Sequence, residues 1–148
     1  MANAVPAYES GPITYQVNQA VVGGQIVQLD TGGMVKPAVA NSVIALGVAT
    51  KDAIPTGTNQ NPTVVGVPQS INLSPISAYT AVAMTGVWRL TNGGGGALAL
   101  GDLVVCAASG AVQKYTAGTS TFDQIIGKCV DPAGIAAGQV GLILIDTV

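Results

Sequence analysis

The chain has 148 residues, 49% of them hydrophobic and only 8% charged, and its formal net charge is −2. The basic residues stand singly and form no stripe that would neutralise a row of phosphates, which argues against nucleic acid as a partner; they are Lys36, Lys51, Arg89, Lys114 and Lys128. Glycine or charge interrupts every apolar run well before the roughly 20 residues that a membrane-spanning helix needs, so we expect no membrane partner.

Small apolar residues dominate the composition. The chain holds twenty glycines but only one Trp, four Tyr and one Phe. Its length predicts one domain, and its low charge, against about 25% in an ordinary domain, predicts surface that is buried against partners. The N-terminus MANAVPAYES lacks the basic opening and apolar stretch of a secretory signal. In a cytosol, Cys106 and Cys129 are expected to stay reduced and to act as small buried hydrophobic residues.

The first half of the chain predicts short strands after an extended arm. Residues 1–12 show no periodicity and carry two prolines, which is typical of such an arm. From Ile13 the pattern breaks into strand-sized apolar pieces bounded by Gly, Asn, Asp or Pro. We predict strands at 24–29, 34–39 and 44–50, with a turn at 30–33.

A proline-rich insertion loop, residues 54–78, interrupts this pattern. Loops of such length are usually functional or disordered, so we predict a contact surface here, the alternative being a floppy surface insertion. Residues 79–90 then predict a strand that bends at Gly86. The four glycines at 93–96 predict a flexible turn and not a phosphate-binding loop, because no lysine follows until Lys114.

Two stretches of the chain are nearly the same and indicate an internal repeat. GQIVQLDTGGMVK, from Gly24, aligns with GDLVVCAASGAVQ, from Gly101, over thirteen positions without a gap. Two copies are too few for a solenoid, so we predict an all-β fold. It would be a small β-barrel or β-sandwich-like domain at 13–148, made of two similar meander units that span 13–53 plus 79–90, and 97–148.

The buried face of each meander follows from its alternation of apolar and polar residues. The predicted core residues are Ile26, Val35, Leu46 and Val48 in the first unit, and Leu103, Val112, Ile126 and Val130 in the second. Each such side chain contributes roughly 1.5 to 3 kcal/mol on burial. Many other core positions are Ala or Gly, so the core is thin, which favours oligomerisation.

The residue inventory argues against an enzyme. The chain has no histidine, which removes Ser-His-Asp and Cys-His arrangements and the nitrogen ligands of the usual zinc sites. A carboxylate pair for glycoside hydrolysis could still be assembled from Asp30, Asp52, Asp102, Asp123 or Asp131. Most of these stand in turn-like contexts, where a carboxylate commonly caps its own backbone. We therefore predict no catalytic, cofactor-binding or metal-binding residues.

The order of motifs along the chain resembles a known family. It runs from ESGPITYQVNQAVVGGQIVQLDTGGMVKPAV through IALGVATKDA and TGVWRL to LGDLVVCAASGAVQK, IIGKCVDPA and GQVGLILI. This order is similar to that of the capsid decoration, or cement, proteins of tailed bacteriophages, over roughly residues 8–148. The matching positions are Gly11, Ile13, Tyr15, Gly47 to Ala49, Gly86 to Trp88 and Gly101 to Val104. The proline-rich insertion is longer than in the simplest members, so its role is not carried over.

The resemblance implies a structural role on a virus particle. It implies a protein made in the host cytoplasm that binds the outer capsid surface of the virion, with the major capsid protein and itself, as a homotrimer, for partners. It would stabilise the shell by bridging neighbouring capsomers. The alternative is an adhesive or carbohydrate-binding module on the virion surface.

The residues expected at capsid or subunit contacts lie in the arm, in the insertion and on one strand. The arm is expected to add a strand to an exposed sheet edge, although terminal residues are often disordered. Tryptophan and arginine are enriched at interface hot spots, although a lone tryptophan is as often ordinary core. The expected contact residues are Val5, Tyr8, Glu9, Ile13, Tyr15, Val64, Val65, Trp88 and Arg89.

Deleting residues 2–12 is expected to weaken capsid attachment and to leave the fold intact, because the deletion removes only the predicted arm. Capsid occupancy, measured by co-sedimentation, and circular dichroism check the two parts of this prediction. Unchanged occupancy would remove the arm from the mechanism.

Overall fold

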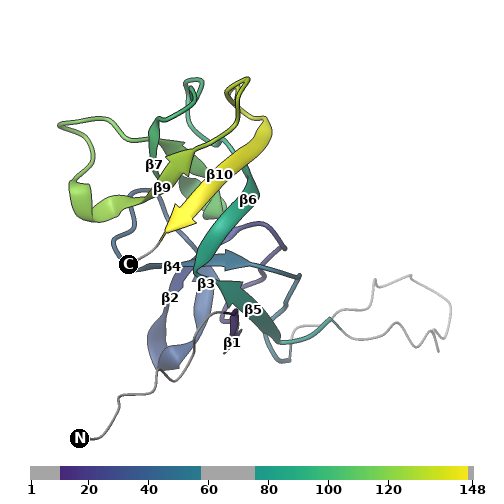
Figure 1. Ribbon diagram of the computed structural model, residues 1–148. Helices are drawn as coiled ribbons and strands as arrows, with labels where there is room; N and C mark the ends of the chain where they lie inside the picture. Colours follow the sequence, from purple (N-terminus) through teal and green to yellow (C-terminus); the bar gives the residue numbers. More distant parts are fainter. Residues whose placement is uncertain (1–10, 58–75, 147–148) are drawn as a thin grey trace, which may run out of the picture.

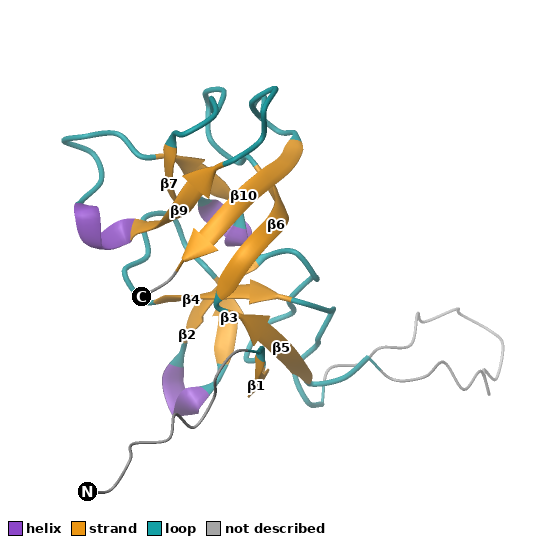
Figure 2. Ribbon diagram, viewed as in Figure 1, coloured by secondary structure: helices purple, strands orange, loops and turns teal. Residues whose placement is uncertain are grey.

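The computed structural model describes residues 11–57 and 76–146, and within them the protein is all-β, as predicted. Ten strands form two antiparallel five-stranded sheets, shown in orange in Figure 2. The first sheet holds β1 (Ile13–Gln16), β2 (Ile26–Leu29), β3 (Val35–Pro37), β4 (Ala45–Ala49) and β5 (Tyr79–Ala83). The second holds β6 (Thr85–Thr91), β7 (Leu103–Cys106), β8 (Val112–Lys114), β9 (Ile125–Cys129) and β10 (Val140–Asp146).

Helix is confined to single turns. The three 3-10 turns of the described chain are η1 (Thr31–Gly33), η2 (Ala108–Gly110) and η3 (Phe122–Gln124). None of the helices in this part of the chain has the length and apolar character that crossing a membrane would require. The strands therefore carry the architecture.

The two sheets have the same topology. The strand order is β1-β5-β4-β2-β3 in the first and β6-β10-β9-β7-β8 in the second, so each strand of the first sheet has a counterpart five strands later. Backbone hydrogen bonds repeat with the strands: Gly24 N donates to the Ala49 carbonyl at 2.8 Å, and Gly101 N donates to the Cys129 carbonyl at 2.8 Å. The internal repeat seen in the sequence is therefore a repeat of backbone structure.

Each sheet curls until its outer strands meet. A parallel bridge joins Val17, just after β1, to Val35 of β3, and the equivalent bridge joins Asn92, just after β6, to Val112 of β8. Closing a sheet in this way gives it an inside that side chains fill. Val17, Val27, Val35, Ala49 and Val82 belong to the buried cluster of the first sheet.

The chain changes sheet across a single residue. Residues 79–90 were expected to form one bent strand of the first unit, but β5 belongs to the first sheet, β6 belongs to the second, and only Met84 stands between them. Figure 1 shows β5 and β6 running on from one sheet into the other. Residues 85–90 therefore belong to the second half of the fold. The sequence did not predict this change of sheet, because the alternation of side chains continues through residues 79–90 and no turn residue separates β5 from β6.

The second half of the fold covers one face of the first sheet. Ile26 and Val48, opposite each other on β2 and β4, are fully buried and cluster with core residues of the second sheet. Turn η2 lies over β2, where a side-chain carbon on Gly110 would come within 2.6 Å of the Ile26 carbonyl oxygen. Ala83 pairs with Val48 and is also buried, and we call Ile26, Val48 and Ala83 the covered row.

Polar contacts fix this joint between the halves. Asn41 N donates to the Cys106 carbonyl at 2.9 Å, and Gly110 N donates to the Ala38 carbonyl at 2.9 Å. The Asn41 side-chain oxygen also accepts hydrogen bonds from Gln113 and Ser120 of the second half. These directional bonds set the halves in one orientation, which apolar packing alone does not specify.

The predicted core is correct at five of its eight positions. Ile26, Val35, Val48, Val112 and Ile126 are buried. Leu46 and Val130 are half-buried. Leu103 was predicted to be core and is 37% exposed, so that prediction is wrong. Leu103 is the counterpart of Ile26, and the two differ because the second half covers Ile26 whereas Leu103 lies on a face that the described chain leaves open.

The strands β4 and β9 each carry a bulge at which the backbone passes very close to the next strand. The register shifts between Val27 and Gln28 opposite β4, and between Val104 and Val105 opposite β9. A side-chain carbon on Gly47 would collide with the Ala83 carbonyl, and one on Gly127 would collide with the Leu144 carbonyl. Only glycine fits at either position, which explains why these two residues align in the repeat.

Gly127→Ala is expected to lower the free energy of unfolding by about 1 to 3 kcal/mol, the usual cost of forcing extra volume into a packed site. Gly95→Ala is the matched control, because nothing lies within 4 Å of its added carbon, and we expect a change within about 0.5 kcal/mol. Urea unfolding followed by tryptophan fluorescence measures both. Equal stabilities would contradict the close approach at Gly127.

Ile26→Ala and Leu103→Ala test the asymmetry between the halves. Truncating Ile26, which is fully buried, is expected to cost about 2 to 5 kcal/mol. Truncating its half-open counterpart Leu103 is expected to cost less than about 1 kcal/mol. The same unfolding assay, run at low protein concentration, compares the two variants. A larger loss of unfolding free energy for Leu103→Ala than for Ile26→Ala would contradict the assignment of the joint.

Candidate functional site

Several carboxylates of the described chain hold turns. Asp52 accepts a hydrogen bond from Gly23 N at 2.8 Å, and Asp131 accepts bonds from Ala133 N and Leu142 N. Among residues 11–57 and 76–146, no group of three or more His, Cys, Asp or Glu side chains gathers as a metal site would. These bonds match the expectation that aspartates here cap backbone.

Two aspartates also carry ion pairs. Asn18, the Thr31 backbone and Lys36 donate hydrogen bonds that lower the pKa of Asp30, whose carboxylate lies 3.2 Å from Lys36 Nζ. Lys114, 2.9 Å away, and the Ala99 backbone N–H lower the pKa of Asp102 in the same way. A lowered pKa keeps a carboxylate ionised at neutral pH, whereas a general acid needs a raised one. Both groups are therefore suited to structural bonds.

Both cysteines are buried. Cys106 and Cys129 are both free thiols in the core of the second half, as predicted for small buried hydrophobic residues. Burial raises the pKa of Cys106 to about 12. The thiolate is the reactive form of cysteine, so Cys106 stays a neutral thiol at neutral pH.

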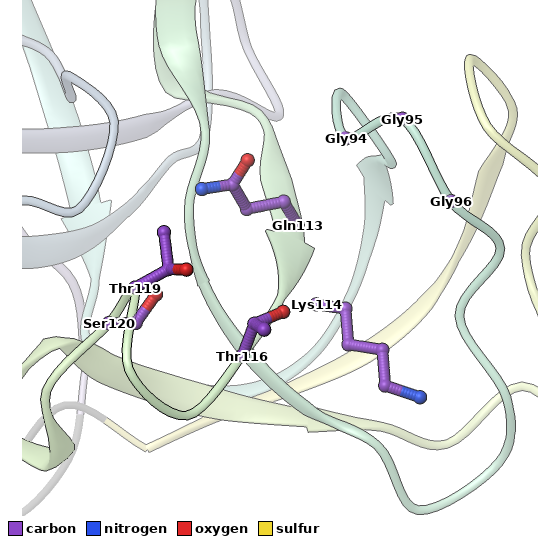
Figure 3. Close-up of a pocket in the computed structure, with 8 residues that line it drawn as sticks. All are labelled: Gly94, Gly95, Gly96, Gln113, Lys114, Thr116, Thr119 and Ser120. Atoms are coloured by element: carbon purple, nitrogen blue, oxygen red, sulfur yellow. The ribbon is translucent and has the colours of Figure 1, made fainter.

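The four-glycine turn borders a shallow polar hollow, shown in Figure 3. The fully buried Asn92 holds the glycine turn in place. Its side-chain amide donates to the carbonyls of Gly96 at 2.8 Å and Ile135 at 3.0 Å. Gly94 N donates back to the Asn92 oxygen at 3.1 Å. The lining side chains Gln113 and Ser120 bond to Asn41 across the joint. These side chains of the hollow therefore help to hold the two halves of the fold together.

Four of the expected contact residues lie in the described chain. Ile13 and Tyr15 are half-buried on β1, an outer strand of the first sheet, and Tyr15 packs against its core. Trp88 packs against the core of the second half, and its indole N–H donates to the Thr85 carbonyl at 3.2 Å. Arg89 is exposed on the opposite side of β6. The structure thus places Ile13 and Tyr15 on one face of β1, and Trp88 and Arg89 on opposite sides of β6.

The other expected contact residues lie outside the described residues. They are Val5, Tyr8 and Glu9 of the arm, and Val64 and Val65 of the insertion. Their assignment as contacts, like that of the four residues above, stays a prediction.

An exposed apolar row crosses the outer face of the second sheet. Leu144 lies opposite Lys128 on one side and Val87 on the other, and Leu103 lies opposite Lys128. Val87 is 55% exposed and the two leucines are each 37% exposed. We call Leu103, Lys128, Leu144 and Val87 the open row. Apolar side chains gathered in this way on a sheet face are typical of a contact surface.

The open row continues into two shallow hollows. One, of about 270 Å³, is lined by Leu103, Lys128 and Leu144. The next, of about 350 Å³, shares Ile125 and Asp146 with it and reaches Phe122 at the start of η3. The second hollow is also lined by Ser42, Val43 and Ala45 of the first half. The surface therefore extends from the second sheet down to the joint.

Sequence reasoning missed the open row. Its signal was present, since alternate residues of GQVGLILID place Val140, Leu142 and Leu144 on one side of β10 and Ile143 and Ile145 on the other. Both sides are apolar, so the pattern does not say which one another element covers. The exposed fractions decide it, because Ile143 and Ile145 are fully buried and Leu144 is not.

Comparison with known proteins gives a likeness of fold. No family model matches the chain, and no curated protein matches it. A solved structure that matches is the head fiber gp8.5 N base in bacteriophage phi29, with a TM-score of 0.59 and 16% sequence identity, over 91% of this chain and 92% of that chain. The protein described here therefore has the fold of a phage head fiber base over nearly its whole length.

Proposed function

We propose that this protein is a structural component of a bacteriophage virion. It binds the outer capsid surface as an oligomer, a homotrimer, and stabilises the shell by bridging neighbouring copies of the major capsid protein. The observation that carries the proposal is the likeness to the phi29 head fiber base, which extends over nearly all of both chains. The family resemblance of the sequence, over roughly residues 8–148, supports the same role from a separate direction.

The chemistry of the described side chains supports a structural role. The carboxylates of Asp52, Asp102 and Asp131 accept bonds from backbone N–H groups of turns. Cys106 is a buried neutral thiol at neutral pH. These three carboxylates and this thiol thus serve the fold.

The surface supports attachment to a lattice. Only 8% of residues are charged, so a contact face on this protein loses little favourable hydration of charge when water leaves it. An oligomer that engages several equivalent lattice sites gains an avidity of about 10² to 10⁴ over one contact when the geometry allows simultaneous binding. A protein that binds only the assembled shell stabilises assembly by mass action.

One observation favours a second candidate function, adhesion or carbohydrate binding at the virion surface. Phe122 is 77% exposed and stacks on Tyr115 with ring centroids 5.5 Å apart. Exposed aromatic rings offer a flat apolar surface, which is the usual platform for a sugar ring. A single such pair is small, so the capsid role remains the main proposal.

Purified protein mixed with empty shells of the phage that encodes it is expected to co-sediment to a saturating, integral number of copies per lattice site. The shells are expected to withstand heating to a higher temperature when decorated. Dissociated capsid subunits serve as the control and are expected to bind at least about 10²-fold more weakly, because they lack the repeated lattice.

Two outcomes would count against the capsid role. Equal binding to shells and to separated subunits would contradict bridging. Binding on a glycan array that Phe122→Ala abolishes, together with failure to bind shells, would establish the second candidate instead.

A further inference from the structure

We propose that the open row is the surface on which a second copy of this chain packs, and that the copy presents the edge around its own η1. The contact between copies would then repeat the joint between the two halves of one chain. This inference deepens the proposed function and rests on the self-association proposed there.

The joint inside the chain supplies the template. One of its sides is the covered row of the first sheet, where Ile26 and Val48 are fully buried. Its other side is an edge of the second half formed by η2, the end of β7 and Trp88 of β6. Gly110 of η2 lies against the Ile26 carbonyl, the Cys106 carbonyl accepts a bond from Asn41, and Trp88 packs in the same cluster.

The first side of this joint has a free counterpart in the second sheet. Equivalence of strands places Leu103 at the position of Ile26, Lys128 at that of Val48, and Leu144 at that of Ala83. The three residues of the covered row are buried, whereas their three counterparts in the open row are exposed. The second sheet therefore has the equivalent face, but nothing in the described chain packs over it.

The other side of the joint has a free counterpart in the first half. The edge formed by η2 and Cys106 corresponds to η1 and Leu29, because β2 and β7 are equivalent strands followed by equivalent turns. Cys106 is fully buried and its carbonyl bonds to Asn41 of the joint, whereas Leu29 is 39% exposed and all three residues of η1 are exposed. We call Leu29 and Thr31–Gly33 the free edge. Each chain therefore has one uncovered face and one uncovered edge, and these correspond to the two sides of the joint between its halves.

These two surfaces indicate that the partner is a second copy of this chain. A face and an edge that belong to one kind of joint complement each other in backbone shape, and both are present on every chain. The resulting contact is heterologous, with the edge of one copy on the face of the next. Such contacts close into a ring when the rotation between copies allows it and otherwise extend into a filament. A ring of three is the form that the proposed function requires.

Leu144→Glu is expected to break the contact, because it places a charge at the centre of a face that must lose its water. The apparent dissociation constant for self-association, from sedimentation velocity, is expected to rise at least about tenfold. Leu29→Glu is expected to have the same effect from the free edge. The controls are Leu100→Glu and Val22→Glu, since both residues are exposed apolar positions that belong to neither the open row nor the free edge. Circular dichroism verifies that each variant is folded, and Leu103→Lys replaces Leu144→Glu should the latter unfold.

Mixing the two variants tests the head-to-tail geometry directly. The Leu144→Glu chain keeps an intact free edge, and the Leu29→Glu chain keeps an intact open row. An equimolar mixture is therefore expected to form a one-to-one dimer that grows no further, although neither variant associates alone. A contact of open row on open row would give no such complementation.

Several results would overturn the inference. They are a wild-type protein that stays monomeric, Leu144→Glu and Leu29→Glu variants that associate like the wild type, an equal loss in the controls, or a mixture that remains monomeric. A Leu144→Glu protein that keeps its oligomeric state but no longer binds shells would assign the open row to the capsid instead. Failure of the wild-type oligomer to bind shells would overturn the proposed function and leave this inference standing, so the two failures are distinguishable.

Discussion

Burial of the covered row beneath the second half is the interaction on which the rest of this structure depends. Ile26 and Val48 give the first sheet a second buried face, and the bonds from Asn41 and Gly110 set the angle at which the halves meet. Without this joint the protein would be two small closed sheets on one tether at Met84. With it, two repeats of one backbone plan become unequal, because one presents a covered face and the other an open one.

Backbone geometry is what the two halves have in common, far more than side chains. The bulges on β4 and β9 need glycine for the same steric reason, and the paired hydrogen bonds around Gly24 and Gly101 match in length. Side chains at equivalent positions differ widely. Asn92 follows β6 and organises the glycine turn, whereas its counterpart Val17 is plain core. The shared backbone structure therefore tolerates side-chain substitution wherever the backbone hydrogen bonds and close approaches are kept. This allows the two halves to carry different side chains and to make different contacts.

Sequence periodicity predicts this fold well where each strand is bounded by a turn residue. The strands of the doubled stretch were expected at 24–29 and 34–39, and they form at Ile26–Leu29 and Val35–Pro37 because Gly and Asp mark their ends. The change of sheet at Met84 was not predictable in this way, since no turn residue accompanies it. The burial of Ile26 and the exposure of Leu103 were equally hidden. Periodicity tells which side chains share a face, but only tertiary packing decides which face another element covers.

Closed sheets also constrain how this protein associates. A sheet whose outer strands meet each other offers little free edge for strand addition. Copies of this chain would therefore associate mainly through side-chain faces such as the open row. Attachment to a shell by the predicted arm would work the opposite way, because the arm brings a strand and the capsid brings the sheet edge. The two associations then use different surfaces. A face-to-edge contact would assemble the oligomer without using the predicted arms, which would leave each arm for a separate capsid site.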